Sequence, residues 1–118
     1  MLSGIPPVTE VDAALLATNM RDARARTLEL VSDLSDQQLI GPRLDIVNPM
    51  LWEIGHVAWF AENFISQRVY KHAPLNDAAQ LLYDSIAIHH HQRWDLPLLS
   101  RDATHAYMQH VLDALLER

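Results

Sequence analysis

The stretch from residue 49 to about residue 72 constrains the fold most, because its apolar residues surround most of a helix instead of forming one stripe. Asn48 is predicted to be the N-cap and Pro49 the first helical residue, while Pro74 cannot continue a helix. A helix that is apolar on most sides is buried against several neighbours. This stretch is therefore predicted to be the central helix of a helical bundle.

Two more long helices are predicted around it from apolar residues that recur at spacings of three and four. One runs from a capping box at Thr9 and Asp12 to about residue 33, and the other follows Ser100, a predicted N-cap. The charged residues of the first helix predict a solvated face: Arg21, Asp22, Arg24, Arg26 and Glu29. The last helix has a predicted core stripe: Ala103, Tyr107, Val111, Ala114 and Leu115.

Shorter helices connect the long ones. Ser35 and Gln38 have the spacing of a capping box for a helical turn, and Asn76 or Asp77 is predicted to cap a helix over about 78–89. No segment shows the alternation of a half-buried strand. The predicted fold class is therefore all-α, an up-down helical bundle of three long helices plus a short one.

The composition indicates a single domain, residues 1–118, with 49% hydrophobic residues. The net charge of −6 and the nine scattered basic residues argue against nucleic acid or an anionic membrane as partner. The absence of cysteine excludes disulfides and thiolate catalysis. No stretch approaches the roughly 18 apolar residues of a membrane span, and no signal peptide pattern is present, so a cytoplasmic protein is expected.

The predicted bundle is incomplete, because antiparallel bundles usually close with four long helices. The sequence stops at Leu115-Leu116-Glu117-Arg118, within a helical pattern and without a C-cap glycine. We expect the fourth bundle helix to be missing from the chain. The exposed apolar face would then be covered by the C-terminal region of a longer protein, of which this chain is an N-terminal fragment, or by a second copy in a homodimer.

His56 is the main candidate functional residue. Trp52, Trp59 and Phe60 lie three or four residues from it and so share its helix face. Gly55 disfavours a helix by roughly 1 kcal/mol relative to alanine, which indicates that something packs or binds close to the backbone there. His56 is either a core histidine bound by a carbonyl, or one metal ligand from one helix of a bundle. Spacing alone does not decide between these interpretations.

The remaining histidines do not complete a metal site by spacing. His105 and His110 are five residues apart, about 140° around a helix, and residues 89–91 are consecutive histidines near a helix end. Glu53 could support His56 as a neighbouring carboxylate. Both Glu53 and Glu62 are predicted mainly as surface charges.

Arg93 follows these histidines and precedes Trp94 and Pro97. An arginine held beside a tryptophan and a stiffened segment is placed to bind a carboxylate through two hydrogen bonds. The alternative is an ion pair between Arg93 and an aspartate that fastens the loop to the bundle.

The sequence resembles the N-terminal DinB-like domain of the ergothioneine-biosynthesis sulfoxide synthases and of the similar selenoneine synthases, over about residues 20–116. The resemblance rests on five motifs: Arg24-x-x-Thr27, Asn48-Pro49-x-x-Trp52-x-x-Gly55-His56-x-x-Trp59-Phe60-x-Glu62, Leu82-Tyr83-Asp84-Ser85, Arg93-Trp94-Asp95-Leu96-Pro97-Leu98 and Tyr107-x-x-x-Val111.

This resemblance implies a non-haem ferrous iron held by three histidines, of which His56 would be the first. The other two belong to a His-x-x-x-His-x-Glu helix, and a C-terminal domain similar to formylglycine-generating enzymes builds most of the substrate pocket. Such enzymes use oxygen to join a thiol or selenol to trimethylhistidine. Arg93 matches a position that in some members holds the carboxylate of the thiol substrate, and His90 stands where those members have a second arginine.

The sequence departs from this family because it has no His-x-x-x-His-x-Glu segment. His56 would be one iron ligand of three, so we expect the 118 residues alone to bind iron poorly and to be inactive. Two alternatives remain open: a stand-alone DinB-like protein that uses a metal, similar to thiol transferases, and a non-catalytic helical dimerisation module.

Overall fold

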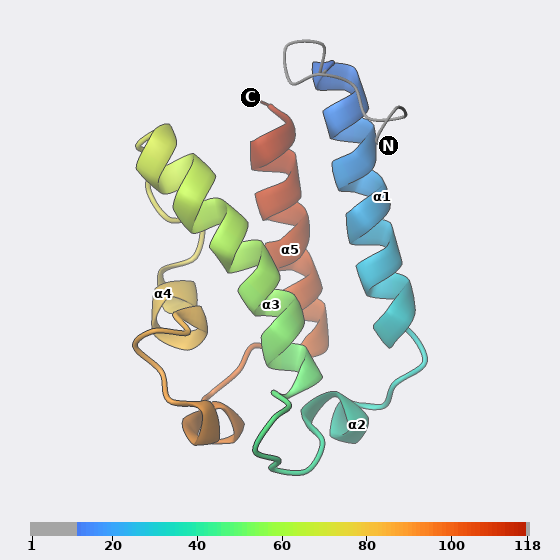
Figure 1. Ribbon diagram of the computed structural model, residues 1–118, viewed down its shortest axis with the longest axis vertical. Coiled ribbons are helices and arrows are strands. Elements are labelled where there is room, and N and C mark those ends of the chain that lie inside the picture. The colour runs from blue at the N-terminus through green and yellow to red at the C-terminus, as the bar shows by residue number, and fades with distance from the viewer. Residues whose placement is uncertain (1–11, 118) are drawn as a thin grey trace, which may run out of the picture.

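The computed structural model describes residues 12–117, and Figure 1 shows that this part of the chain is a bundle of helices without strands. The elements in chain order are α1 (Ala13–Val31), α2 (Asp36–Ile40), α3 (Met50–Ala61), the π-helix η2 (Glu62–Val69), α4 (Asp77–Tyr83), the 3₁₀ helix η3 (His90–Trp94) and α5 (Arg101–Leu116). The all-α prediction is confirmed. Within the described residues, no helix is both long and apolar enough to cross a bilayer.

α3 is the central helix, as predicted. It packs against α5 on one side and against α4 on the other, while α5 lies between α3 and α1 (Figure 1). Trp52 and Ala58 of α3, Tyr83 of α4 and Val111 of α5 meet in the core and are at most 1% exposed. One strip of the central helix is not covered by another helix of the described residues. Val57 and other apolar residues on this strip are about half exposed.

The long helix predicted over 49–72 is α-helical only to residue 61. It continues as a π-helix and ends in a wider turn, where the backbone N–H of Tyr70 donates to the carbonyl of Ile65 at 3.1 Å. Lys71 then takes a left-handed conformation with φ 60°. The prediction for Asn48 is also wrong in detail. Pro49 is the N-cap residue, and no side chain caps this helix.

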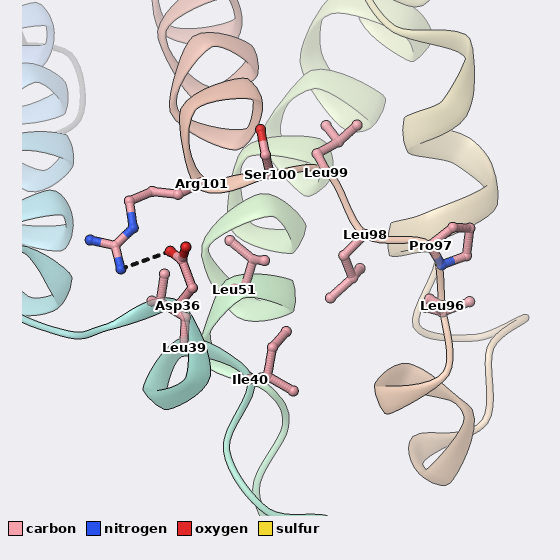
Figure 2. A pocket seen from close by; sticks show the side chains of 10 residues that line it. All are labelled: Asp36, Leu39, Ile40, Leu51, Leu96, Pro97, Leu98, Leu99, Ser100 and Arg101. Atoms are coloured by element: carbon pink, nitrogen blue, oxygen red, sulfur yellow. Dashed lines mark ion pairs between the residues drawn. The ribbon is translucent and has the colours of Figure 1, made fainter.

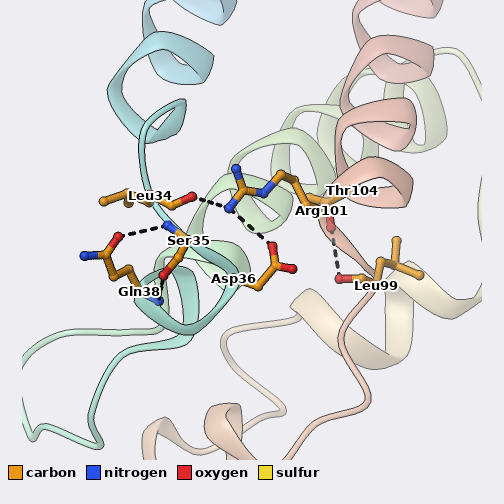
Figure 3. Close-up of polar contacts among 7 residues, drawn as sticks. All are labelled: Leu34, Ser35, Asp36, Gln38, Leu99, Arg101 and Thr104. Carbon is orange, nitrogen blue, oxygen red and sulfur yellow. Dashed lines mark hydrogen bonds and ion pairs between the residues drawn. The ribbon is translucent and has the colours of Figure 1, made fainter.

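Other local predictions at helix ends are confirmed. The Ser35 hydroxyl accepts from the backbone N–H of Gln38, whose side chain accepts from the N–H of Ser35, which completes the capping box (Figure 3). Asn76 caps α4 and Ser100 caps α5. Asp12 caps α1, whereas the predicted partner Thr9 lies outside the described residues.

The structure corrects both long amphipathic patterns. On α5 the buried positions are Thr104, Tyr107, Met108, Val111, Leu112 and Leu115, while Ala103 is exposed and Ala114 only partly buried. On α1, Arg24 leaves the predicted solvated face, because it is partly buried and its guanidinium donates to the carbonyl of Met108 at 3.4 Å. α4 ends at Tyr83, earlier than predicted.

A hollow of about 390 Å³ lies below the bundle, between α2, the first turn of α3 and the segment that leads into α5 (Figure 2). Aliphatic side chains line most of it. At one edge Arg101 pairs with Asp36 at 3.3 Å and also donates to the carbonyl of Leu34 (Figure 3). These contacts fasten α2 to the start of α5.

Candidate metal-ligand site

His56 lies on α3 within a group of aromatic rings. Its imidazole is parallel to the indole of Trp52, with ring centres 4.5 Å apart and an angle of 10°. The rings of Trp59 and Phe60 follow at 5.8 and 6.3 Å. The predicted sharing of one helix face is therefore present, and the imidazole is half-buried.

One nitrogen of His56 is anchored to the bundle. Nδ1 lies 2.8 Å from the backbone carbonyl oxygen of Tyr83. A carbonyl oxygen only accepts hydrogen bonds, so Nδ1 carries the proton. In the neutral ring Nε2 then has the lone pair, and Nε2 makes no hydrogen bond within residues 12–117. The carbonyl partner expected of a core histidine is present, but it occupies only one of the two nitrogens.

Gly55 explains how α4 comes close enough to bind His56. A Cβ atom at this position would lie 2.3 Å from Cζ of Tyr83, far inside van der Waals contact. The phenol ring of Tyr83 therefore rests directly on the backbone of α3, and Tyr83 is fully buried. This confirms the prediction that something packs against the helix backbone at Gly55.

Arg93 lies on η3 and is 9% exposed. Its guanidinium carbon stands 4.1 Å from the centre of the Trp52 ring. One terminal nitrogen donates to Oδ1 of Asn48 at 2.9 Å, and the other donates to the carbonyls of Ser85 and Ile88 at 3.2 and 3.1 Å. Nε of Arg93 is buried without a partner among the described residues. Burial lowers the pKa of Arg93, and the charge of Glu53 raises it in part.

The aspartate ion pair considered for Arg93 is made by another arginine. Arg43 pairs with Asp95 at 2.7 Å. His90, the other predicted substrate contact, bonds through Nε2 to the carbonyl of Leu44 at 2.5 Å. Arg93 and His90 thus lie on the same short helix, and both bond to the loop between α2 and α3, while Arg93 also bonds to the segment after α4.

A family comparison decides the class of this helical bundle. The model of the DinB superfamily matches residues 19–118, most of the chain. The chain belongs to the DinB superfamily. No curated protein matches this DinB domain significantly.

The described residues of the DinB domain do not form a complete metal site. Among residues 12–117, no three side chains of His, Cys, Asp or Glu gather where they could hold one ion. His56 supplies a single imidazole, and one imidazole does not hold ferrous iron in the three-histidine arrangement that the resemblance implies. A resident metal therefore does not fit this set of donors by itself.

An open hollow of about 380 Å³ is lined by Trp59 and Phe60, whose rings lie 5.8 and 6.3 Å from that of His56. Trp59, Phe60 and Phe64 form one wall, and Gln80 and Asp84 contribute polar groups. Trp59 donates through Nε1 to Gln80 at 3.1 Å, which holds this wall in place. Two rings that neighbour His56 thus line an open hollow between α3, η2 and α4.

The sequence interpretation missed a buried polar pair. Glu62, predicted as a surface charge, is 1% exposed, and its two carboxylate oxygens accept from the Tyr107 hydroxyl at 2.6 Å and from the Leu75 N–H at 2.8 Å. Burial, then the hydrogen bond and charge of Glu62, raise the pKa of Tyr107 well above its usual range. The only sequence signal was a glutamate that continues the apolar face of the central helix.

Proposed function

We propose that this DinB domain supplies one histidine ligand, His56, to a non-haem ferrous iron in an oxygen-dependent sulfoxide or selenoxide synthase. The remaining ligands would come from a segment outside these residues. The observation that supports this proposal is the hydrogen bond of His56, in which a backbone carbonyl accepts from Nδ1–H and leaves the Nε2 lone pair without a hydrogen bond among the described residues.

This arrangement is typical of metal-ligating histidines, which usually donate the second ring N–H to a carbonyl or carboxylate. Members of the DinB superfamily often bind metals. Three neutral imidazoles with open coordination positions suit an iron that also binds oxygen and substrate. Ferrous iron would supply the oxygen chemistry, whereas the stacked ring of Trp52 and the carbonyl of Tyr83 would orient the imidazole.

The proposed substrates are a thiol or selenol and trimethylhistidine. We propose Arg93 and His90 as contacts for the carboxylate of the sulfur or selenium substrate. Both terminal nitrogens of Arg93 already have protein acceptors, so a carboxylate would bind at Nε or displace one of the two carbonyls. The arginine is held rigidly by Asn48 and Trp52, which favours a defined binding geometry.

Two experiments test the proposal. The coding sequence beyond Arg118 is read first; a His-x-x-x-His-x-Glu segment is expected, and a stop codon directly after Arg118 would count against the synthase. In the second, Co²⁺ is titrated into the ¹⁵N-labelled chain, and the ring signals of His56 are expected to broaden before those of His110, an exposed histidine of α5. Equal broadening of both histidines would argue against a ligand role.

A non-catalytic dimerisation module is the second candidate, because apolar side chains on the uncovered strip of α3 and η2 are 42–51% exposed: Val57, Phe60 and Phe64. Contiguous exposed apolar surface is often an interaction site. Light scattering across a dilution series distinguishes the two functions. A dimer that persists, together with no effect of Co²⁺ at His56, would favour the module.

A further inference from the structure

The C-terminal end of α4 is bound by two stacked rings from α3. Nε1 of Trp52 donates to the carbonyl of Leu82 at 2.7 Å, and Nδ1 of His56 donates to the carbonyl of Tyr83 at 2.8 Å. The last carbonyls of any helix have no partner within the helix. Two consecutive carbonyls of α4 therefore receive their hydrogen bonds from two parallel rings one turn apart on the neighbouring helix.

Gly55 sets the separation at which these bonds form. The atoms of Tyr83 nearest to a Cβ at position 55 are Cζ, the hydroxyl oxygen and Cε1, at 2.3 to 2.5 Å. These atoms belong to a rigid ring that is fully buried, so the ring cannot turn aside into solvent. Any side chain at position 55 would push Tyr83, and with it the end of α4, away from His56.

We propose that Gly55 and Tyr83 together select the tautomer of His56. The ring of Tyr83 lies on Gly55, and this contact places the carbonyl of Tyr83 against Nδ1, which keeps the proton on Nδ1 and the lone pair on Nε2. This inference rests on the proposed function of His56 as a ligand, because a ligand nitrogen has to be unprotonated. Tyr83 acts through His56 and is a positioning residue.

The proposal assigns separate tasks to the two rings that meet α4. Trp52 fixes the plane of the imidazole by stacking, and its own N–H is used at Leu82. The carbonyl of Tyr83 then decides which nitrogen of that plane carries the proton. A ring held only by stacking would still exchange between its two tautomers, since stacking does not distinguish the nitrogens.

The test records the tautomer of His56 by two-bond ¹H–¹⁵N correlation in the metal-free chain, at a pH above the reference imidazole pKa of about 6.5. The wild-type chain is expected to show the Nδ1–H form alone. Gly55→Ala is expected to convert His56 into a mixture that contains the Nε2–H form. Tyr83→Leu, which removes the ring that rests on Gly55, is likewise expected to admit the Nε2–H form.

Gly41→Ala is the matched control. Gly41 has φ 67° and no close neighbour at its Cβ position, so alanine strains the backbone there without moving α4. The control should lower stability and leave the tautomer of His56 unchanged. If Gly55→Ala does not fold, Tyr83→Leu decides: a mixture that contains Nε2–H supports the proposal and Nδ1–H alone overturns it.

An Nε2–H form in the wild-type chain, or an unchanged tautomer in a folded Gly55→Ala variant, would overturn the inference. The result is independent of metal binding. Suppose that the wild-type chain shows Nδ1–H, that Gly55→Ala changes this tautomer, and that Co²⁺ has no effect at His56. The positioning role of Gly55 and Tyr83 would then be supported, and the ligand function of His56 would be rejected.

Discussion

Replacement of Tyr107 by phenylalanine tests how strongly the buried Glu62 contact holds α5 against the central helix. Phenylalanine keeps the ring that lies 6.1 Å from Tyr83 and removes only the hydroxyl that donates to Glu62 at 2.6 Å. The carboxylate is 1% exposed, so water does not replace the lost donor, and the Leu75 N–H remains its only partner in the described chain.

The expected cost follows from these contacts. A hydrogen bond to a charged group contributes about 1.5–3 kcal/mol to stability. The expected cost of Tyr107→Phe lies in the upper half of that range, because the variant leaves a buried carboxylate without one of its donors. We therefore expect Tyr107→Phe to lower the free energy of unfolding by about 2–3 kcal/mol. This is a large part of the roughly 5–15 kcal/mol typical of a small domain.

Urea unfolding followed by far-ultraviolet circular dichroism measures this change. A cycle of Tyr107→Phe, Glu62→Gln and the double variant isolates the pair, with an expected coupling of about 1.5 kcal/mol or more. Gln109→Met, which removes an exposed hydrogen bond to Asp113 on the same helix, is the control and should change stability by less than about 0.5 kcal/mol. A similarly small effect of Tyr107→Phe would refute the reasoning.

Two further predictions concern buried polar groups. Burial raises the pKa of Tyr83, partly offset by the Thr104 hydroxyl, and the pKa of Tyr107 is raised as well. Above about pH 10 the unfolded chain loses these protons while the folded chain keeps them, so the free energy of unfolding should fall as the pH rises. The expected fall is up to about 1.4 kcal/mol per pH unit for each tyrosine, and it should be less steep in Tyr107→Phe. Urea unfolding from about pH 9 to 11 measures it. Arg93→Met should cost about 2 kcal/mol or more by the same assay, because it leaves buried acceptors without a donor.

Each of these predictions has its own failing outcome. Equal pH slopes for the wild-type chain and Tyr107→Phe would exclude the raised pKa of Tyr107 as a cause of alkaline destabilisation. For Arg93, the control is Arg26→Met, which removes an ion pair with Asp22 whose side chains are 76% and 59% exposed and should cost at most about 0.5 kcal/mol. A loss at Arg93 no larger than at Arg26 would contradict a structural role for its hydrogen bonds.

The candidate site was partly predictable. His56, its aromatic neighbours and the close approach at Gly55 follow from helical spacing, because residues three and four apart share a face whatever the helix packs against. Spacing could not show that Tyr83, 27 residues later, would bind Nδ1. Asn48 was predicted to cap the helix, but its side chain instead binds Arg93 and Glu53, since these groups meet only after the loops have folded.

The amino-acid sequence by itself determined the helical class, the central place of α3 and the caps at Ser35, Asn76 and Ser100, because these depend on apolar periodicity and on hydrogen bonds between residues two or three apart. Only the tertiary structure decided the protonated nitrogen of His56 and the burial of Glu62 against Tyr107, 45 residues away. The packing of the helices determines which distant carbonyl or hydroxyl contacts a side chain, and a local sequence pattern does not show which one it is.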